Sequence, residues 1–155
     1  MNAVTKFVIA ASALIVGHSA WAQSLDERKQ MSSDNVFVAI QKLCPVSGQP
    51  LGQHGPPIKA TAGKQKEQVF LCCKGCFGKQ IDPKVWDRIH RQYMVAQGRC
   101  PVMKNPLPKK PTMTIADGRP IYTCCPPCVK KIAGEPIKYV REVDRLYAVS
   151  LNSNE

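Results

Sequence analysis

The 155-residue sequence has no cysteine and no proline in its first 43 positions; Cys44 and Pro45 are the first of each type. Aromatic residues make up only 6% of the chain, and 11 acidic residues stand against 22 Lys plus Arg. After residue 22 no apolar run approaches the roughly 20 residues that a transmembrane helix needs. Together with the short length, these absences exclude a multi-span membrane protein and a multi-domain enzyme.

Catalytic signatures are also missing. The sequence contains no nucleophile elbow, no phosphate-binding Gly-rich loop and no Cys-x-x-Cys-His haem attachment motif. It shows no pair of carboxylates on a recognisable frame either. We therefore expect a protein that is not an enzyme.

The first 22 residues have the pattern of an export signal. Lys6 supplies a positive start, residues 7–16 are apolar and uncharged, and Ala20-Trp21-Ala22 has the form of a cleavage site. No cysteine follows this run before Cys44, which argues against a lipid anchor. The pattern predicts a signal peptide over residues 1–22 and a periplasmic or secreted protein without a transmembrane span in its mature chain.

The net charge of +11 is spread over the chain without a long basic run. Outside the cytoplasm, such a charge suggests an anionic membrane surface, acidic partners or no specific partner. We expect no nucleic-acid partner.

The eight cysteines fall into two sets of four with the same order. Each set is a Cys-Pro-Val, a gap, and then a Cys-Cys-x-x-Cys, and Cys100 follows Cys44 by 56 positions. Pro50-Leu51 matches Pro106-Leu107, and Val69-Phe70-Leu71 matches Ile121-Tyr122-Thr123. So many ordered matches indicate an internal duplication.

Each repeat predicts a hairpin and a helix. We expect strands over 57–61 and 67–72, and over 112–116 and 119–124, the second pair around a turn-forming Asp117-Gly118. Helices are expected from about Ser33, from a cap at Asp82 to Gly98, and from Pro136. The fold class is therefore α+β, with two small units that share a helix and pack together. The predicted divisions are an N-terminal helical segment (23–43), a first unit (44–97), a second unit (98–150) and a tail (151–155).

Units of about 55 residues are marginal without a metal, disulfides or a partner. Cys72 and Cys76 are four positions apart, as are Cys124 and Cys128, so a helix there would place each pair on one face, within reach of one metal ion. The distant first cysteine of each set would supply a third ligand. The predicted metal ligands are Cys44, Cys72, Cys76, Cys100, Cys124 and Cys128.

The fourth ligand is left open. Cys73 and Cys125 are additional candidates, but adjacent helical residues point about 100° apart, which favours buried thiols that pack the core. His54 has no counterpart in the second repeat and is interpreted as a loop residue, although it could complete the first site. Three sulfurs suit Cu(I) and four suit zinc, so we expect copper or zinc, about one ion per repeat. Met94, Met103 and Met113 are interpreted as core residues and His90 as a surface or packing residue.

The succession of Cys-Pro-Val-x-x-x-Pro, an apolar hairpin, Cys-Cys-x-x-Cys and x-Pro-x-x-Tyr/Trp resembles the small metal-binding modules called TRASH and YHS domains. The resemblance covers roughly residues 44–148. It implies two tandem treble-clef-like units, each a Cys-Pro knuckle, a β-hairpin and a helix, that bind a heavy metal through three cysteines. Buffering, carrying or sensing that metal is the implied function.

Two other functions compete with this one. An even number of cysteines in an exported chain also fits a disulfide-stapled interaction module. Cys73-Lys74-Gly75-Cys76 and Cys125-Pro126-Pro127-Cys128 also have the C-x-x-C form of thiol redox proteins. Three of each four cysteines crowd into one short segment, which favours a metal over a scaffold of spread disulfides.

Overall fold

The structure is a computed structural model that describes residues 33–153. The predicted signal peptide lies outside these residues. None of the helices described is both long and apolar enough to cross a membrane.

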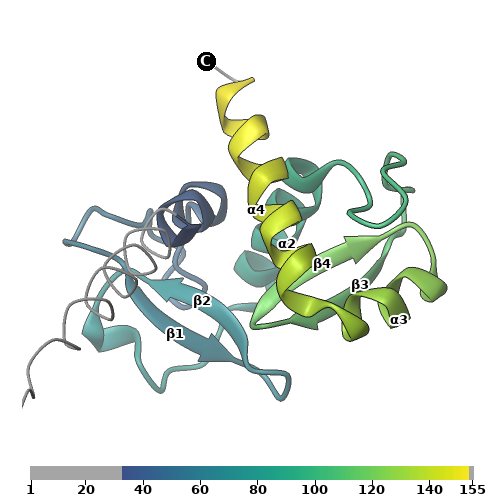
Figure 1. Ribbon diagram of the computed structural model, residues 1–155. Coiled ribbons are helices and arrows are strands. Elements are labelled where there is room, and N and C mark those ends of the chain that lie inside the picture. The colour runs from purple at the N-terminus through teal and green to yellow at the C-terminus, as the bar shows by residue number, and fades with distance from the viewer. Residues whose placement is uncertain (1–32, 154–155) are drawn as a thin grey trace, which may run out of the picture. The chain divides into compact units, whose positions relative to one another are not determined.

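The described part of the chain is α+β, with two antiparallel hairpins and helices around them (Figure 1). Residues 33–41 are helical and lead into the first repeat. The elements that follow are β1 (Ile58–Ala62), β2 (Glu67–Leu71), the 3-10 turn η1 (Lys74–Cys76), α2 (Pro83–Gln97), β3 (Thr112–Ala116), β4 (Arg119–Thr123), α3 (Pro126–Gly134) and α4 (Pro136–Asn152).

Both predicted hairpins are confirmed, with strand ends that differ from the expectation by one residue at most. Asp117 and Gly118 both have positive φ, 48° and 74°, as a two-residue turn of this twist requires. Pro120 lies in β4 opposite Ile115. A proline is tolerated there because each strand of a two-stranded sheet has a free edge.

The helix expected after the first cysteine cluster is confirmed. The Asp82 side chain accepts hydrogen bonds from the backbone N–H groups of Lys84 and Val85, and Gly98 ends α2 in the left-handed conformation. α2 then runs directly into the second repeat at Cys100. The helix that was expected to open at Pro136 is α4.

The expectation of one helical face carrying Cys72 with Cys76, and Cys124 with Cys128, is wrong. Cys72 directly follows β2, and helical geometry begins only at Lys74 and lasts a single 3-10 turn. In the second repeat, Cys124 directly follows β4 and α3 begins at Pro126. The paired sulfurs therefore come from a strand end and the following turn, and not from one helix.

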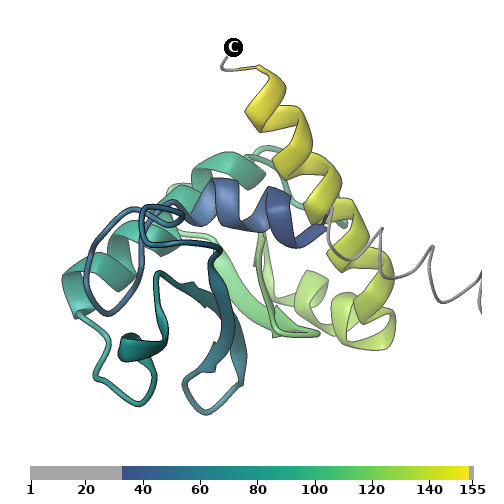
Figure 2. The same cartoon turned by 90° about the vertical axis from the view of Figure 1, so that its left-hand side faces the viewer.

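The two repeats share one hydrophobic core, which confirms that they pack together. Phe37 of the first helical segment stacks on Tyr93 of α2 at 4.8 Å between ring centroids, and Tyr93 lies 6.2 Å from Tyr147 of α4. In Figure 2 the segment 33–41 runs across α2 and reaches α4 at one end. A second, smaller cluster belongs to the first repeat alone and consists of Cys44, Leu71, Cys72 and Cys76.

Gly118 connects the two hairpins through a backbone hydrogen bond. We expect Gly118→Ala to destabilise the protein by about 1–2 kcal/mol. Its carbonyl accepts a hydrogen bond of 2.7 Å from the N–H of Gln68, and an added Cβ would lie 3.3 Å from the Gln68 Cβ. Gly134→Ala is the matched control, because nothing lies within 4 Å of its Cβ position and its φ is not positive. Urea unfolding of both variants measures the difference, and equal stabilities would contradict the role of Gly118.

Candidate metal centre

The first cysteine of each repeat sits in a tight turn of the same geometry, which we call the knuckle (residues 44–49 and 100–105). Two backbone hydrogen bonds close each knuckle, and their lengths agree between repeats to 0.1 Å. They run from Cys44 N to Gln49 O (2.8 Å), Gly48 N to Cys44 O (2.9 Å), Cys100 N to Asn105 O (2.9 Å) and Lys104 N to Cys100 O (2.8 Å). The duplication seen in the sequence is therefore also a duplication of local structure.

A buried glutamine ties each knuckle to the hairpin of its own repeat. The Gln41 amide donates to the carbonyl of Phe70 (2.7 Å) and accepts from its N–H (2.9 Å). Gln97 makes the same pair of bonds with Tyr122, at 2.6 and 2.9 Å. Sequence reasoning missed both residues, although each stands three positions before a first cysteine. These clamps fix the strand end that carries the second cysteine relative to the first.

The first sulfur triad consists of Cys44, Cys72 and Cys76, all three buried. The Cys76 Sγ lies 3.7 Å from the Sγ of Cys44 and 3.7 Å from the Sγ of Cys72. The hydroxyl of Ser47, from the knuckle, lies 3.4 Å from the Cys72 Sγ. A hollow of about 430 Å³ reaches Cys76 and is lined by residues of the hairpin, the following loop and Val46 of the knuckle.

The second sulfur triad consists of Cys100, Cys124 and Cys128, with Cys124 partly exposed. The Sγ atoms of Cys124 and Cys128 are 3.9 Å apart. Within each triad, the sulfurs all lie within 4.8 Å of one another. The structure thus brings together the six cysteines that the sequence predicted as ligands, three in each repeat.

These separations fit a metal bound by thiolates. Sulfurs at about 2.3 Å from a tetrahedral ion lie about 3.8 Å apart. The separations of 3.7, 3.7 and 3.9 Å therefore need little rearrangement to accept an ion. The donor set is all sulfur, which suits zinc and Cu(I) and not a hard cation.

Cys73 and Cys125 lie against the triads and are only partly buried, which corrects the expectation of buried thiols, although Cys73 also packs against the small cluster of the first repeat. The Cys73 Sγ is 3.9 Å from the sulfurs of both Cys72 and Cys76. The Cys125 Sγ is 3.8 Å from Cys124 and 3.2 Å from Cys128. Both residues have extended backbones and partly exposed side chains, so the helical angle of 100° does not apply to them. Each triad therefore has a fourth sulfur on its outer side.

The knuckle favours a thiolate at the first cysteine of each triad. Burial raises the pKa of Cys44, but hydrogen bonds from Ser47 and from the backbone N–H groups of Cys72 and Val46 outweigh it and lower the pKa to about 6. Burial of Cys100 is outweighed in the same way by backbone N–H groups, among them that of Met103, so its pKa is also lowered. Burial and the neighbouring sulfurs raise the pKa of Cys76 to about 12.

The fourth sulfurs are expected to be the most reactive thiols of the reduced, metal-free protein. A hydrogen bond with Cys72 lowers the pKa of Cys73, and one with Cys128 lowers the pKa of Cys125. The pKa of Cys128 is raised, and burial is the largest cause. Iodoacetamide at neutral pH should modify Cys73 and Cys125 about tenfold faster or more than Cys76 and Cys128. Peptide mapping after short exposures measures the order. Faster modification of Cys76 would contradict it, and unfolding in urea should abolish it.

The other sulfur and imidazole candidates lie apart from the triads or in different roles. His54 is exposed in the loop after the first knuckle and belongs to no group of candidate ligands among the described residues. Met94 packs against the core as expected. Met103 and Met113 are 51% and 42% exposed, so their interpretation as core residues is wrong.

Three polar side chains, one after another, link the two repeats away from the sulfurs. The Glu67 Oε1 lies 3.3 Å from the His90 Nε2, and the His90 Nδ1 lies 2.7 Å from the Tyr122 hydroxyl. Glu67 is 6% exposed, and burial raises its pKa to about 8. Burial also lowers the pKa of His90. At neutral pH both groups are therefore favoured in their uncharged forms. The contact between the Glu67 Oε1 and the His90 Nε2 does not have hydrogen-bond geometry. No sequence pattern predicts this arrangement, because its members belong to three separate elements, β2, α2 and β4.

We expect Glu67→Gln to stabilise the protein increasingly as the pH rises from 5 to 8. The pKa of Glu67 in the folded state lies above its ordinary value of 4.5, so the folded protein holds this proton more tightly than the unfolded chain does. The wild type therefore loses stability as the pH rises toward 8, whereas a glutamine at this position has no proton to lose. The advantage of the variant should grow by on the order of 3 kcal/mol over this range. Urea unfolding of the reduced protein measures it.

Glu142→Gln is the matched control for that pH series. A hydrogen bond from Arg145 lowers the pKa of Glu142 to about 2. Its stabilising effect is therefore complete above pH 5 and is lost only at lower pH. The difference between this variant and the wild type should stay constant from pH 5 to 8. A constant difference for Glu67→Gln as well would contradict the buried neutral carboxyl.

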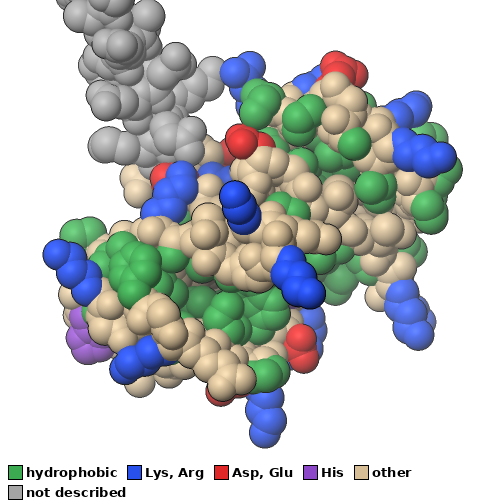
Figure 3. Space-filling model, turned by 90° about the horizontal axis from the view of Figure 1, so that it is seen from below, with side chains coloured by type: hydrophobic (Ala, Val, Ile, Leu, Met, Phe, Trp, Pro, Cys, Tyr) green, Lys and Arg blue, Asp and Glu red, His purple; other side chains and the backbone are tan. Residues whose placement is uncertain are grey.

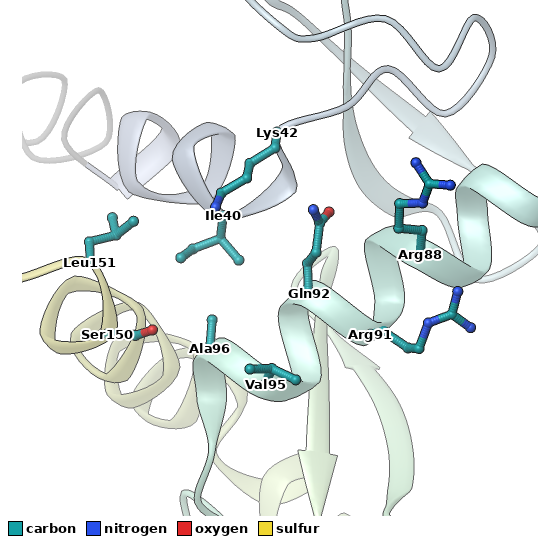
Figure 4. Close-up of a pocket in the computed structure, with 9 residues that line it drawn as sticks. All are labelled: Ile40, Lys42, Arg88, Arg91, Gln92, Val95, Ala96, Ser150 and Leu151. Carbon is teal, nitrogen blue, oxygen red and sulfur yellow. The ribbon is translucent and has the colours of Figure 1, made fainter. Parts of the chain in front are cut away.

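One face of the described molecule carries more basic than acidic side chains. Figure 3 shows Lys and Arg side chains that stand apart from one another, with few acidic ones between them. A hollow of about 290 Å³ lies between the segment 33–41, α2 and the end of α4, where Ile40 and Ala96 point toward one another (Figure 4). Lys42, Arg88 and Arg91 border it. Its lining contains no cysteine, histidine or carboxylate, so it is separate from the two sulfur triads.

Comparison with known proteins adds no relative: no protein-family model, no characterised protein and no solved structure matches this chain.

Proposed function

We propose that this chain is an exported heavy-metal-binding protein with one thiolate site in each repeat, which buffers, carries or senses copper or zinc. The observation that carries the proposal is the spacing of the triads. Two sets of three sulfurs, brought together from separate parts of the chain, have the separations that a thiolate-bound ion requires. Export is proposed from the leader-like residues 1–22. No catalytic role is assigned.

The local architecture supports the same proposal. Each repeat has a Cys-Pro knuckle, a hairpin and a following helical segment, in the order of the treble-clef modules that the sequence resembles. The knuckle N–H groups stabilise thiolates, which are the form that binds metal. On this basis we also propose that the two repeats are tandem TRASH/YHS-like modules.

A disulfide-stapled module is the second candidate. The 3.2 Å between the sulfurs of Cys125 and Cys128 favours it, since a small movement would join them. This pair exists in the first repeat as Cys73 and Cys76, but with 3.9 Å between the sulfurs. All eight cysteines have free thiols in the structure.

Native mass spectrometry of the exported protein, combined with thiol alkylation after denaturation, tests the proposal. We expect about one bound ion per repeat and alkylation of all thiols once the metal is removed, with the mass increment identifying copper or zinc. A protein without metal, without reactive thiols and lighter by about two hydrogens per bridge would overturn the metal proposal in favour of the disulfide module.

A further inference from the structure

The two triads differ at one position of the knuckle that faces the sulfurs. Positions 47 and 103 are 56 residues apart, as the first cysteines are, and hold serine and methionine. The backbone is equivalent there, because the next residue of each knuckle, Gly48 or Lys104, donates its N–H to the first cysteine's carbonyl at 2.9 or 2.8 Å. Residues 48 and 104 also share a positive φ, 69° and 62°. The side chains at positions 47 and 103 therefore leave the chain from matching places.

In the first repeat this place is next to the metal-binding sulfurs. The Ser47 hydroxyl lies 3.4 Å from the Cys72 Sγ, and the N–H of Ser47 is hydrogen-bonded to the Cys44 sulfur. In the second repeat the N–H of Met103 is likewise hydrogen-bonded to the Cys100 sulfur. The backbone of Met103 therefore has the same contact with the second triad as the backbone of Ser47 has with the first.

The Met103 side chain is free to turn toward the second triad. It is 51% exposed and belongs to neither hydrophobic cluster, so no packing in the core holds it elsewhere. Methionine has an unbranched chain with three rotatable bonds, which carries its sulfur farther than a serine hydroxyl reaches. Cys124 is also more exposed than its counterpart Cys72, so the second triad is more open on one side.

The two side chains would act on a bound metal ion in different ways. A serine hydroxyl beside a thiolate is a hydrogen-bond donor, which tunes the bound ion from outside without ligating a soft one. A methionine thioether is a soft, neutral ligand that favours Cu(I) and adds little to zinc binding. The same three cysteines therefore have different additional partners in the two repeats.

We propose that the two sites are not equivalent and that the second is the Cu(I) site, with the Met103 thioether as a ligand beside Cys100, Cys124 and Cys128. The inference rests on the proposed function and assigns a metal to one repeat. Binding forms a Cu–S bond to the neutral thioether and requires no proton loss from that residue. The first site, with Ser47 in place of the thioether, prefers Cu(I) less strongly over zinc.

A reciprocal exchange tests the proposal in the full-length reduced protein. Site-specific values come from Cys76→Ser, which leaves the second triad, and Cys128→Ser, which leaves the first. Cu(I) held by bicinchoninate and Zn(II) held by a chromogenic chelator are the probes, under anaerobic conditions. We expect Met103→Ser to lower the Cu(I) affinity of the second site at least about tenfold and the zinc affinity far less. Ser47→Met should raise the Cu(I) affinity of the first site.

Met113→Ser is the matched control, because Met113 is also largely exposed but lies on β3. It should change neither affinity. X-ray absorption of the Cu(I)-loaded protein gives an independent readout, since Met103→Ser should remove one sulfur neighbour from the copper of the second site. Unchanged Cu(I) to zinc preference in both reciprocal variants, with metal still bound, would overturn this inference alone. Absence of both metals from the wild type would overturn the proposed function as well.

Discussion

The double variant Cys76→Ser with Cys128→Ser is expected to lose metal from both repeats, whereas each single variant loses it from one. Cys76 lies 3.7 Å from both other sulfurs of its triad, so its removal leaves only two ligands of that set. Cys128 has the corresponding place at the first turn of α3. Two thiolates hold zinc or Cu(I) far more weakly than three, and structural metal binding is coupled to folding. The variants should therefore also unfold at lower denaturant concentration than the metal-loaded wild type.

Metal content by native mass spectrometry and urea unfolding with and without a chelator measure both effects. Cys73→Ser with Cys125→Ser is the matched control, because it removes two sulfurs as well but leaves both triads intact. It should retain about one ion per repeat. If the Cys76/Cys128 double variant kept its metal, these two cysteines would not be ligands, and the proposal that the triads are the metal sites would be wrong.

Replacing Gln41 with leucine is expected to destabilise the protein by about 4 kcal/mol, even though leucine is apolar and of similar size. Gln41 is fully buried, and its amide also donates to the carbonyl of Leu43 (2.8 Å) and accepts from the Tyr93 hydroxyl (3.1 Å). With the two bonds to Phe70, four hydrogen bonds depend on this side chain, three of them buried and the one to Leu43 partly buried. Each buried group left without a partner costs about 1–3 kcal/mol, and the losses within one network are not additive.

Gln97→Leu should have a similar but smaller effect, because Gln97 bonds to two residues, Tyr122 and Arg99. Gln65→Leu, at an exposed position of the first hairpin turn, is the control and should change the free energy of unfolding by less than about 0.5 kcal/mol. Urea unfolding of reduced, metal-free protein measures all three. Equal stabilities of Gln41→Leu and Gln65→Leu would show that the clamp has no energetic role.

The clamps also predict a consequence for the site. Gln41 fixes the backbone of Phe70, two residues before Cys72, while the chain from Gln41 to Cys44 enters the knuckle. Loss of the clamp should therefore weaken metal binding at the first site without removing a ligand. Addition of metal should restore part of the stability, since an ion that binds only the folded state shifts the equilibrium toward it.

Local sequence signals determined the strands, the turns and the helix ends. Asp117-Gly118 specifies its turn because few residue pairs accept positive φ at both positions, and Asp82-Pro83 starts α2 by a cap and a preset φ. The duplication and the six cysteines of the triads could also be recognised from the sequence, because matched spacing can be read without knowing which residues are in contact. The sulfurs meet for a different reason than expected, since Cys72 and Cys124 directly follow strands and do not belong to helices.

Only the tertiary structure decided which of the remaining residues act together. Gln41 and Phe70, or Glu67, His90 and Tyr122, are far apart in sequence, and no periodicity marks their contacts. The same holds for the methionines, because burial depends on what packs above a residue: Met94 lies against the shared core while Met103 is exposed beside a triad. The sequence by itself determined local geometry and the cysteine sulfurs that the two repeats offer to a metal. Burial and long-range hydrogen bonds, which arise only when the two repeats pack on one core, determined how the ligands are held.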